Sequence, residues 1–227
     1  MPFATWWRGD PLRDLPPLPG LTVRRSLNRA LINQMTGLTR PAVEGRIKAD
    51  NAFFVALLDR EPTAYGWAAL REGRIDELLF RFAVPPGNAY LWDFETLSRW
   101  RGRGIYPQLL QGVTALLGGV DRFWIGYAGH NAASGRGIEK AGFRVVGDLT
   151  ISGERVAGIE PAGTVGADDA RFLAAAEVFR PVGVPAGTAP DDATPPDHAK
   201  RPDGAVQAAG VTQLPDASPA ADSGGLP

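Results

Sequence analysis

The stretch Trp-Arg-Gly-Arg-Gly-Ile-Tyr-Pro, residues 100–107, places two glycines and two arginines directly before a segment with helical apolar spacing. Glycines let backbone N–H groups converge on an anion, and the N-terminus of a helix adds partial positive charge. Arg101 and Arg103 offer charge-assisted hydrogen bonds, and Pro107 fits a first helical turn, where its missing N–H costs nothing. These residues predict an anion site, with an ordinary surface loop as the alternative.

Two common phosphate-binding loops do not fit this stretch. A P-loop requires Gly-Lys-Ser/Thr, which the sequence lacks, and the dinucleotide fingerprint requires a third glycine within residues 107–109. An Arg/Gly nucleic-acid patch is also disfavoured, because only three arginines cluster and the formal net charge of the chain is −1.

A second motif, residues 130–143, reads His-Asn-Ala-Ala-Ser-Gly-Arg-Gly-Ile-Glu-Lys-Ala-Gly-Phe. Together the two motifs resemble those of the GNAT acyltransferase superfamily, in the same order and at the same separation. The first matches its Gln/Arg-x-x-Gly-x-Gly/Ala loop through Arg101, Gly102, Arg103, Gly104 and Ile105. The second matches its later pattern at Asn131, Ser134, Lys140, Gly142 and Phe143. The resemblance covers roughly residues 21–159.

The resemblance implies an α/β fold of the GNAT type, with a mixed sheet that is flanked by helices and splayed open between two neighbouring parallel strands. Acetyl-CoA, as co-substrate, would lie in that gap. Its pyrophosphate would bind the amides of residues 102–106, and its pantetheine arm would run along the preceding strand, from Phe94 to Thr96. Asn131 would bond the arm from the other side, and Ser134 would either bond the CoA chain or cap a helix.

Two positions depart from the family pattern. Tyr106 stands where the loop motif ends in glycine or alanine, so its side chain would narrow the site or reach the ligand. Ile138 stands where many members carry the tyrosine thought to protonate the departing thiol.

Acyl transfer to an amine also needs a base, an oxyanion site and an acid. Asp93 and Glu95 are the carboxylates on the strand before the glycine loop, so they are the candidate bases. Strand alternation puts both on one face and residues 92, 94 and 96 on the other. Family members tend to place their base on the face that would hold residues 90 and 92, and a β-bulge would swap the faces. Backbone N–H groups near Phe94 and Glu95 would serve the oxyanion.

Three further side chains are candidates for proton transfer. His130, just before Asn131, could titrate at the end of a strand or simply face water. Tyr127 and Tyr106 are candidate acids for the CoA thiolate, although a tyrosine on an apolar strand more often packs.

The chain has 227 residues, 44% of them hydrophobic and 22% charged, as is usual for a globular protein. With no cysteine and two histidines, disulfides and Cys or His-rich metal sites are excluded, so we expect no metal. No signal peptide or membrane-length apolar run is present, and we expect a cytoplasmic protein that binds neither membrane nor nucleic acid.

Residues 181–227 hold nine prolines and no aromatic residue, which predicts a disordered tail. The expected organisation is an N-terminal arm over residues 1–20, a catalytic domain over 21–180 and this tail.

Hydrophobic periodicity and turn residues predict the following elements. Strands are expected over residues 21–27, 52–58, 63–70, 75–84, 89–97, 123–127, 143–151 and 155–159. Helices are expected over residues 29–35, from 39–41 onward, from 105 to about 117, over 131–141 and over 168–179. This order indicates a mixed α/β domain with at least one parallel strand pair connected by a helix.

These observations predict an enzyme that transfers an acetyl group from acetyl-CoA to a small-molecule or peptide amine by direct attack. A CoA-binding regulatory module without catalysis, and transfer of a longer acyl or aminoacyl group, stay open as alternatives. The acceptor's identity, and whether the chain forms a homodimer, do not follow from the sequence.

Overall fold

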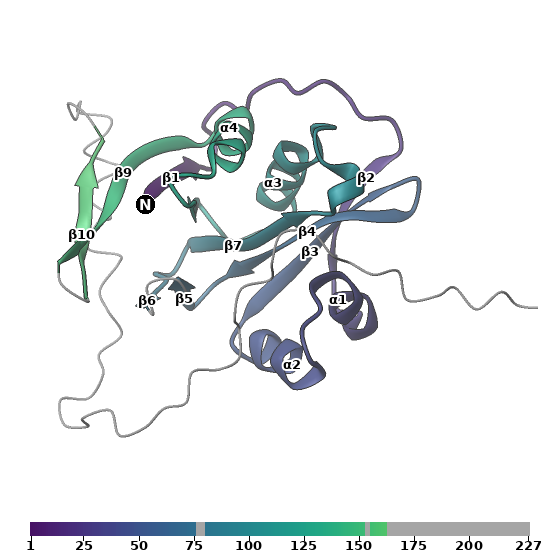
Figure 1. Ribbon diagram of the computed structural model, residues 1–227, viewed down its shortest axis with the longest axis horizontal. Helices are drawn as coiled ribbons and strands as arrows, with labels where there is room; N and C mark the ends of the chain where they lie inside the picture. Colours follow the sequence, from purple (N-terminus) through teal and green to yellow (C-terminus); the bar gives the residue numbers. More distant parts are fainter. Residues whose placement is uncertain (76–79, 153–154, 163–227) are drawn as a thin grey trace, which may run out of the picture. The chain divides into compact units, whose positions relative to one another are not determined.

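A large mixed sheet carries the fold, with helices on both of its faces (Figure 1). The computed structural model describes residues 1–75, 80–152 and 155–162. In the described part of the chain the strand order of this sheet is β10-β9-β1-β8-β7-β4-β3-β2. Its strands are β1 (Pro2–Trp7), β2 (Leu21–Ser26), β3 (Asn51–Leu58), β4 (Glu61–Ala69), β7 (Asn88–Thr96), β8 (Arg122–Gly126), β9 (Arg144–Ser152) and β10 (Arg155–Pro161).

The helices lie on opposite faces of the sheet. α1 (Arg29–Thr36) and α2 (Arg40–Lys48) cover one face, and α3 (Ile105–Leu116) and α4 (Ala132–Lys140) cover the other (Figure 1). Asn28 caps α1 as predicted, because its Oδ1 accepts from the Leu31 N–H at 3.1 Å. No described helix has the length and apolar character needed to cross a membrane.

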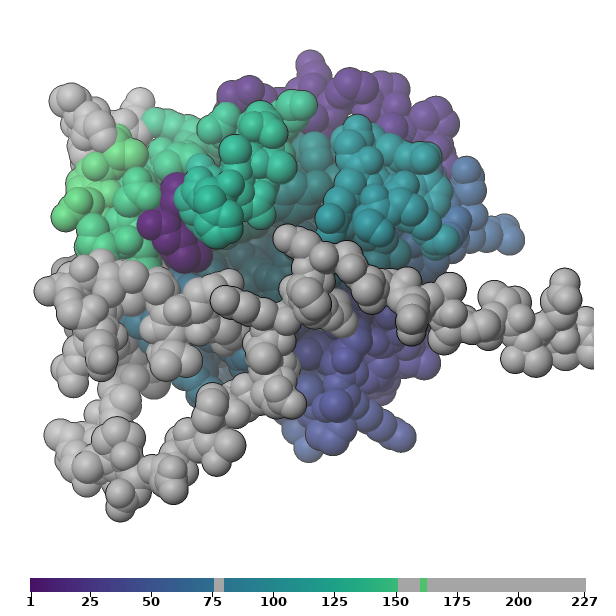
Figure 2. All heavy atoms as spheres, in the orientation of Figure 1, coloured from purple at the N-terminus to yellow at the C-terminus, as the bar shows by residue number. Residues whose placement is uncertain are grey.

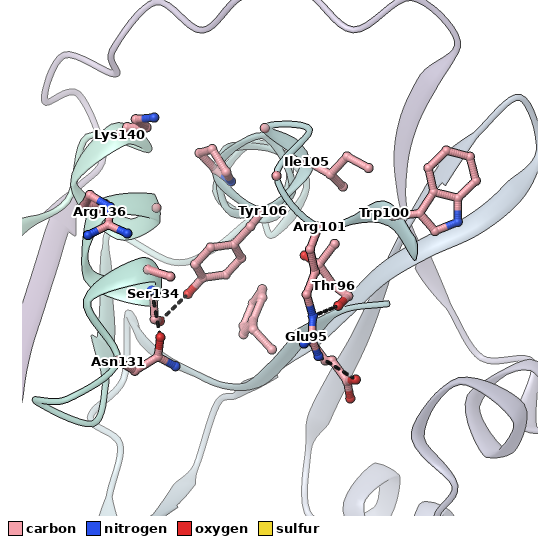
Figure 3. A pocket seen from close by; sticks show the side chains of 16 residues that line it. Glu95, Thr96, Trp100, Arg101, Ile105, Tyr106, Asn131, Ser134, Arg136 and Lys140 are labelled. Atoms are coloured by element: carbon pink, nitrogen blue, oxygen red, sulfur yellow. Dashed lines mark hydrogen bonds and ion pairs between the residues drawn. The ribbon is translucent and has the colours of Figure 1, made fainter. Parts of the chain in front are cut away.

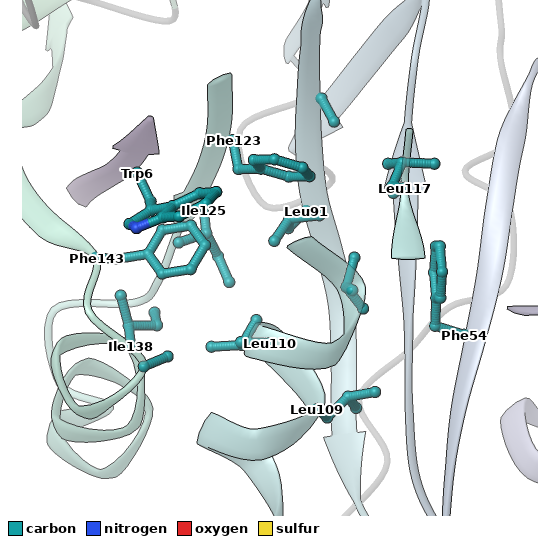
Figure 4. Packing of buried hydrophobic residues seen from close by; sticks show 14 of the residues in the cluster. Trp6, Phe54, Leu91, Leu109, Leu110, Leu117, Phe123, Ile125, Ile138 and Phe143 are labelled. Atoms are coloured by element: carbon teal, nitrogen blue, oxygen red, sulfur yellow. The ribbon is translucent and has the colours of Figure 1, made fainter. Parts of the chain in front are cut away.

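The parallel strand pair predicted across a helix is β7 and β8, with α3 as the connection. The apolar side chains of α3 recur at helical spacing and pack into the main core together with Ile138 and Phe143 (Figure 4). Arg8 holds the other end of α3, since its guanidinium donates to the carbonyls of Thr114, Leu117 and Val120. These contacts fix the helix whose N-terminus follows the glycine loop.

The start of the chain is not the separate arm that we expected. Residues 2–7 form β1, which pairs antiparallel with β8 on one side and with β9 on the other. Phe3, Ala4 and Trp6 are buried, so these apolar residues extend the core. The connection from β1 to β2 then runs over α3 and α4 (Figures 1 and 2), where the carbonyls of Arg13 and Pro16 accept bonds from α3.

The strand expected over residues 75–84 is wrong. The structure has two strands there, β5 (Glu72–Ile75) and β6 (Phe80–Ala83), which pair antiparallel as a separate two-stranded sheet. Ile75, Phe80 and Phe82 are buried. A continuous strand through residue 75 would bury odd-numbered positions, whereas the buried side chains of β6 are even-numbered, so the alternation changes phase between the two.

The remaining strand and helix predictions within the described residues agree with the structure to within a few residues, including the β9–β10 hairpin. The helix expected over residues 168–179 and the tail from residue 181 lie outside the described residues.

Candidate functional site

The sheet opens between β7 and β8. The two strands pair in parallel from Asn88↔Arg122 to Leu91↔Ile125. β8 then ends at Gly126, whereas β7 continues to Thr96. Within residues 1–75, 80–152 and 155–162, the side of β7 that faces β8 therefore has no ladder partner over residues 92–96, which leaves backbone groups available to a ligand.

A β-bulge interrupts β7 inside this opening. Trp92 pairs with Trp67 on β4, but the next paired residue, Glu95, lies opposite Tyr65, so two residues of β7 face one of β4. Asp93 takes a left-handed conformation, with φ of 52°. The ring of Phe94 covers Gly66, where an added Cβ would lie 2.4 Å from the ring. Gly66 therefore makes room for the bulge.

The bulge corrects the expected arrangement of faces on β7. Asp93 forms an ion pair with Arg46 of α2, and Glu95 accepts a bond of 2.9 Å from the Tyr65 hydroxyl. Arg46 also stacks on Trp92, with 4.3 Å from Cζ to the ring centroid. Trp92 and both carboxylates thus share the α1–α2 side, because the extra residue changes the alternation. Phe94 lies on the opposite side, in the α3 core.

The glycine loop presents unengaged backbone amides beside the opening. Gly102 and Gly104 have φ values of 78° and 76°, a left-handed conformation that favours glycine. Among the described residues, no hydrogen bond is formed by the N–H groups of residues 102–106. No side chain of the described part of the chain caps α3, so its N-terminus is open to an anion.

A cavity of about 510 Å³ lies between this loop and α4 (Figure 3). β7 contributes Phe94, Glu95 and Thr96 to its wall, and the loop and α3 contribute Arg101, Gly102, Gly104, Ile105 and Tyr106. Asn131, Ser134, Arg136 and Lys140 line the α4 side. The first cavity therefore brings together nine of the ten residues predicted to bind CoA. Arg103 stacks on Trp100, with 4.7 Å from Cζ to the ring centroid, and does not line this cavity.

The sequence prediction did not include Arg136 and Lys140 in the site. They lie one helical turn apart on α4 and face the first cavity (Figure 3). Their spacing of four residues, after a glycine loop with two arginines, was the available signal. With Arg101 they give this cavity three cationic side chains and one carboxylate, that of Glu95.

Asn131 and Ser134 act together at the start of α4. The Asn131 Oδ1 accepts from the Ser134 N–H at 3.0 Å, so Asn131 is the N-cap of the helix. Of the two roles expected for Ser134, capping of the helix is wrong, because Asn131 is the cap and Ser134 is its partner. The side-chain NH₂ of Asn131 has no acceptor within the described residues.

Tyr106 bridges the two motifs across the cavity. Its hydroxyl lies 3.5 Å from the Ser134 Oγ (Figure 3). The centroid of its ring lies 6.0 Å from that of the Phe94 ring. Burial between α3 and α4 raises the pKa of Tyr106 to about 12. An added Cβ at Gly137 would lie 2.4 Å from the Tyr106 ring, so Gly137 on α4 makes room for the tyrosine.

We expect Gly137→Ala to destabilise the protein, although alanine is the better helix former. Alanine gains about 0.5–1 kcal/mol over glycine in a helix, but overpacking a filled site costs about 1–3 kcal/mol. Gly45→Ala is the matched control, because Gly45 is also inside a helix and nothing lies within 4 Å of its added Cβ. Urea denaturation should show a lower free energy of unfolding for Gly137→Ala and a higher one for Gly45→Ala than for the wild type. Stabilisation by Gly137→Ala would mean that the Tyr106 ring does not occupy this position.

The raised pKa of Tyr106 predicts a loss of stability in strong base. An unfolded tyrosine titrates near pH 10, and folded Tyr106 holds its proton to about pH 12. The contribution of protonated Tyr106 to the free energy of unfolding is therefore fully present below pH 10 and is lost as the pH rises from 10 to 12. Between pH 9 and pH 11.5, the free energy of unfolding should fall more in the wild type than in Tyr106→Phe. An equal fall in the free energy of unfolding of both proteins would contradict the raised pKa of Tyr106.

A second cavity, of about 210 Å³, lies on the opposite face of the sheet. Asp93 and Tyr127, two of the predicted catalytic residues, line it together with Arg46, Arg74, Tyr90 and Trp92. Glu95 instead lines the first cavity, although its carboxylate lies on the α1–α2 side, bonded to Tyr65 and 3.7 Å from Arg101. The opening between β7 and β8 separates the two cavities.

The remaining proton-transfer candidates are placed differently. His130 is exposed in the turn before α4 and lines neither cavity. Tyr127 packs over Gly135, and burial, followed by the charges of Glu139 and Asp148, raises its pKa. Ile138 is fully buried in the main core.

In the described part of the chain, no group of three or more carboxylate or histidine side chains could hold a metal ion.

No protein-family model matches the sequence. No curated protein matches it significantly.

Several solved structures are similar to the chain. A GCN5-related N-acetyltransferase from Kribbella flavida is 17% identical, with a TM-score of 0.45; the match covers 63% of this chain and 53% of that one. This chain thus spans about half the length of that protein. AAC(6')-Iy, in complex with a bisubstrate analogue of CoA and acetylneamine, is 19% identical, with a TM-score of 0.45 and coverage of 60% and 98%. AAC(6')-Ib, in complex with ribostamycin and coenzyme A, is 17% identical, with a TM-score of 0.46 and coverage of 60% and 88%.

Proposed function

We propose that this chain is a GNAT-type N-acetyltransferase that moves an acetyl group from acetyl-CoA to a small-molecule amine. The observation that carries the proposal is the set of unengaged amides at residues 102–106, directly beside the opening between β7 and β8. A helix N-terminus with free N–H groups suits a pyrophosphate, and an open strand side suits an amide-containing arm.

The first cavity supplies the groups that acetyl-CoA needs. Arg101, Arg136 and Lys140 provide positive charge around the phosphates. The unpaired side of β7 would bond the pantetheine amides over residues 92–96. The side-chain NH₂ of Asn131 would donate to a carbonyl of the same arm, while its Oδ1 keeps capping α4.

The transfer proceeds by direct attack of a neutral amine nitrogen on the thioester carbonyl. A C–N bond forms and the C–S bond breaks, and backbone N–H groups at the bulge stabilise the oxyanion between these events. The amine proton passes to Asp93 or Glu95, directly or through water. Tyr127 and Tyr106 are protonated at neutral pH, and either would be the proton donor to the thiolate; burial raises the pKa of both, which makes each a weaker acid than a free tyrosine.

A second candidate is a CoA-binding module without catalysis. It is favoured by the full burial of Ile138 in the core, which leaves no proton donor at that position, and by the engagement of Asp93 with Arg46.

Two measurements test these proposals on the full-length protein. Isothermal titration with acetyl-CoA should show saturable binding, and absence of binding at millimolar ligand would reject both candidates. Release of the CoA thiol with a panel of small amines should show steady turnover. Binding without turnover on any amine would leave the non-catalytic module.

A further inference from the structure

The cationic side chains of the first cavity fall into two groups. Arg101 is engaged within the protein, because its Nε donates to the Thr96 carbonyl at 3.0 Å and its Nη2 lies 3.7 Å from the Glu95 carboxylate. The side chains of Arg136 and Lys140 line the same cavity and form no hydrogen bond or ion pair with a described residue. In the described part of the chain, the unbalanced positive charge of this cavity therefore lies on α4.

The stability of α4 does not explain this pair of cations. Residues four apart are neighbours on a helix, about 6 Å apart along its axis, so the like charges of Arg136 and Lys140 repel each other. Lys140 lies in the last turn, where a positive charge is favourable, but Arg136 lies in the middle of the helix. Both side chains are exposed at the rim of the cavity. An anion bound between them would remove the repulsion.

The direction of α4 places the two cations toward the nucleotide end of a bound donor. The helix begins at Asn131, shortly after the end of β8 and hence at the sheet opening, and it ends at Lys140. Figure 3 shows Asn131, Ser134, Arg136 and Lys140 in this order along the cavity. Under the proposed function the thioester lies at the opening and Asn131 bonds the arm, so the far end of α4 faces the part of the donor beyond the arm.

We propose that Arg136 and Lys140 bind the 3′-phosphate of CoA, so that the chain selects a donor with a terminal phosphate monoester. This inference rests on the proposed function. A phosphate monoester carries about −1.5 to −2 charges at neutral pH. Each phosphate of the pyrophosphate carries a single charge, and the free amides of residues 102–106 serve this group. The dianion is therefore the group that matches two unengaged cations.

The assignment separates donors that share the same acyl-bearing arm. Dephospho-CoA has the arm and the pyrophosphate but lacks the 3′-phosphate, so it leaves both cations without a partner. An arm attached to a carrier protein through a phosphodiester has no phosphate monoester either. Free CoA thioesters are the donors that satisfy all the free groups of the first cavity.

Isothermal titration of the full-length protein with CoA and with dephospho-CoA tests the inference. CoA should bind about tenfold more tightly, as expected when two exposed cations bind one dianion. Equal affinities, or tighter binding of dephospho-CoA, would overturn the inference and leave the proposed function standing. Absence of binding by acetyl-CoA, CoA and dephospho-CoA would instead reject the proposed function, and this inference with it.

Variants of the two cations locate the preference in the structure. Arg136→Gln and Lys140→Gln should each lower the ratio of the two affinities, and the double variant should bring it to about one. Arg136→Glu should reverse the order, so that dephospho-CoA binds more tightly. Lys140→Arg keeps the charge and should keep the preference for CoA. A tenfold preference that persists in the double variant would contradict the assigned residues.

Lys48→Gln is the matched control. Lys48 is an exposed lysine in the last turn of α2, as Lys140 is in α4, and it lines neither cavity. The control changes the net charge and the helix terminus in the same way, so its ratio of affinities should equal that of the wild type. An equal loss of preference in Lys48→Gln and Lys140→Gln would assign the preference to net charge and overturn the inference. Thermal unfolding verifies that each variant is folded.

Discussion

Gly104→Asp is expected to abolish tight binding of acetyl-CoA while the protein stays folded. Gly104 precedes α3 with φ of 76°, and aspartate and asparagine tolerate this conformation better than other non-glycine residues. An added Cβ meets nothing within 4 Å, so the side chain is accommodated without a clash. The new carboxylate, however, lies where the amides of residues 102–106 would bind a phosphate. Repulsion between the two anions should cost roughly 2–4 kcal/mol, or about 30- to 1,000-fold in affinity.

Gly104→Asn is the matched control for this experiment. It has the same backbone strain and nearly the same shape but no charge, so its affinity should fall much less. Isothermal titration gives the affinities, and thermal unfolding without ligand verifies that both variants are folded to the same extent. Wild-type affinity in Gly104→Asp would show that the phosphates bind elsewhere.

Asp93→Asn is expected to lower turnover by about 100-fold with little change in acetyl-CoA affinity. Asp93 lines the second cavity, and under the proposed function it is a candidate base; loss of a general base typically costs 10²- to 10⁴-fold. Asparagine suits the left-handed backbone at this position, and its carbonyl oxygen can still accept a bond from Arg46. The change therefore removes basicity and leaves the bulge in place.

Glu95→Gln provides the comparison for the base. Glu95 lines the first cavity and is held by Tyr65, so its loss should reduce kcat less than tenfold. At one pH, kcat/KM should fall by about 100-fold in Asp93→Asn and by less than tenfold in Glu95→Gln. The reverse result would assign the base to Glu95, and unchanged turnover in both would assign it to water.

The elements around the site follow from local sequence. The glycine loop, the helix after it and the Asn131 turn each depend on residues that are neighbours in the chain, so periodicity and turn chemistry predict them. The splay also agrees with the expectation from the motifs, because β8 ends where the apolar run of residues 123–125 ends.

What the sequence could not provide depends on contacts between distant segments. Strict alternation put Trp92 opposite Asp93, whereas the bulge arises from the meeting of Gly66 on β4 with Phe94 on β7. Arg46 reaches Asp93 from a helix 47 residues away in the chain. Gly137 is small because Tyr106 lies against it, and neither residue predicts the other by local pattern.

The position of β1 has a consequence for how the chain reaches its native state. This strand is made long before its partners on β8 and β9, with Phe3 opposite Gly126 and Ala4 opposite Val145. Joining such distant segments closes a long loop, which slows folding. During synthesis, the apolar side chains of Phe3 and Trp6 stay exposed to solvent until most of the domain has been translated. The middle of the sheet is therefore completed late, and the nascent chain is most prone to aggregation in that interval.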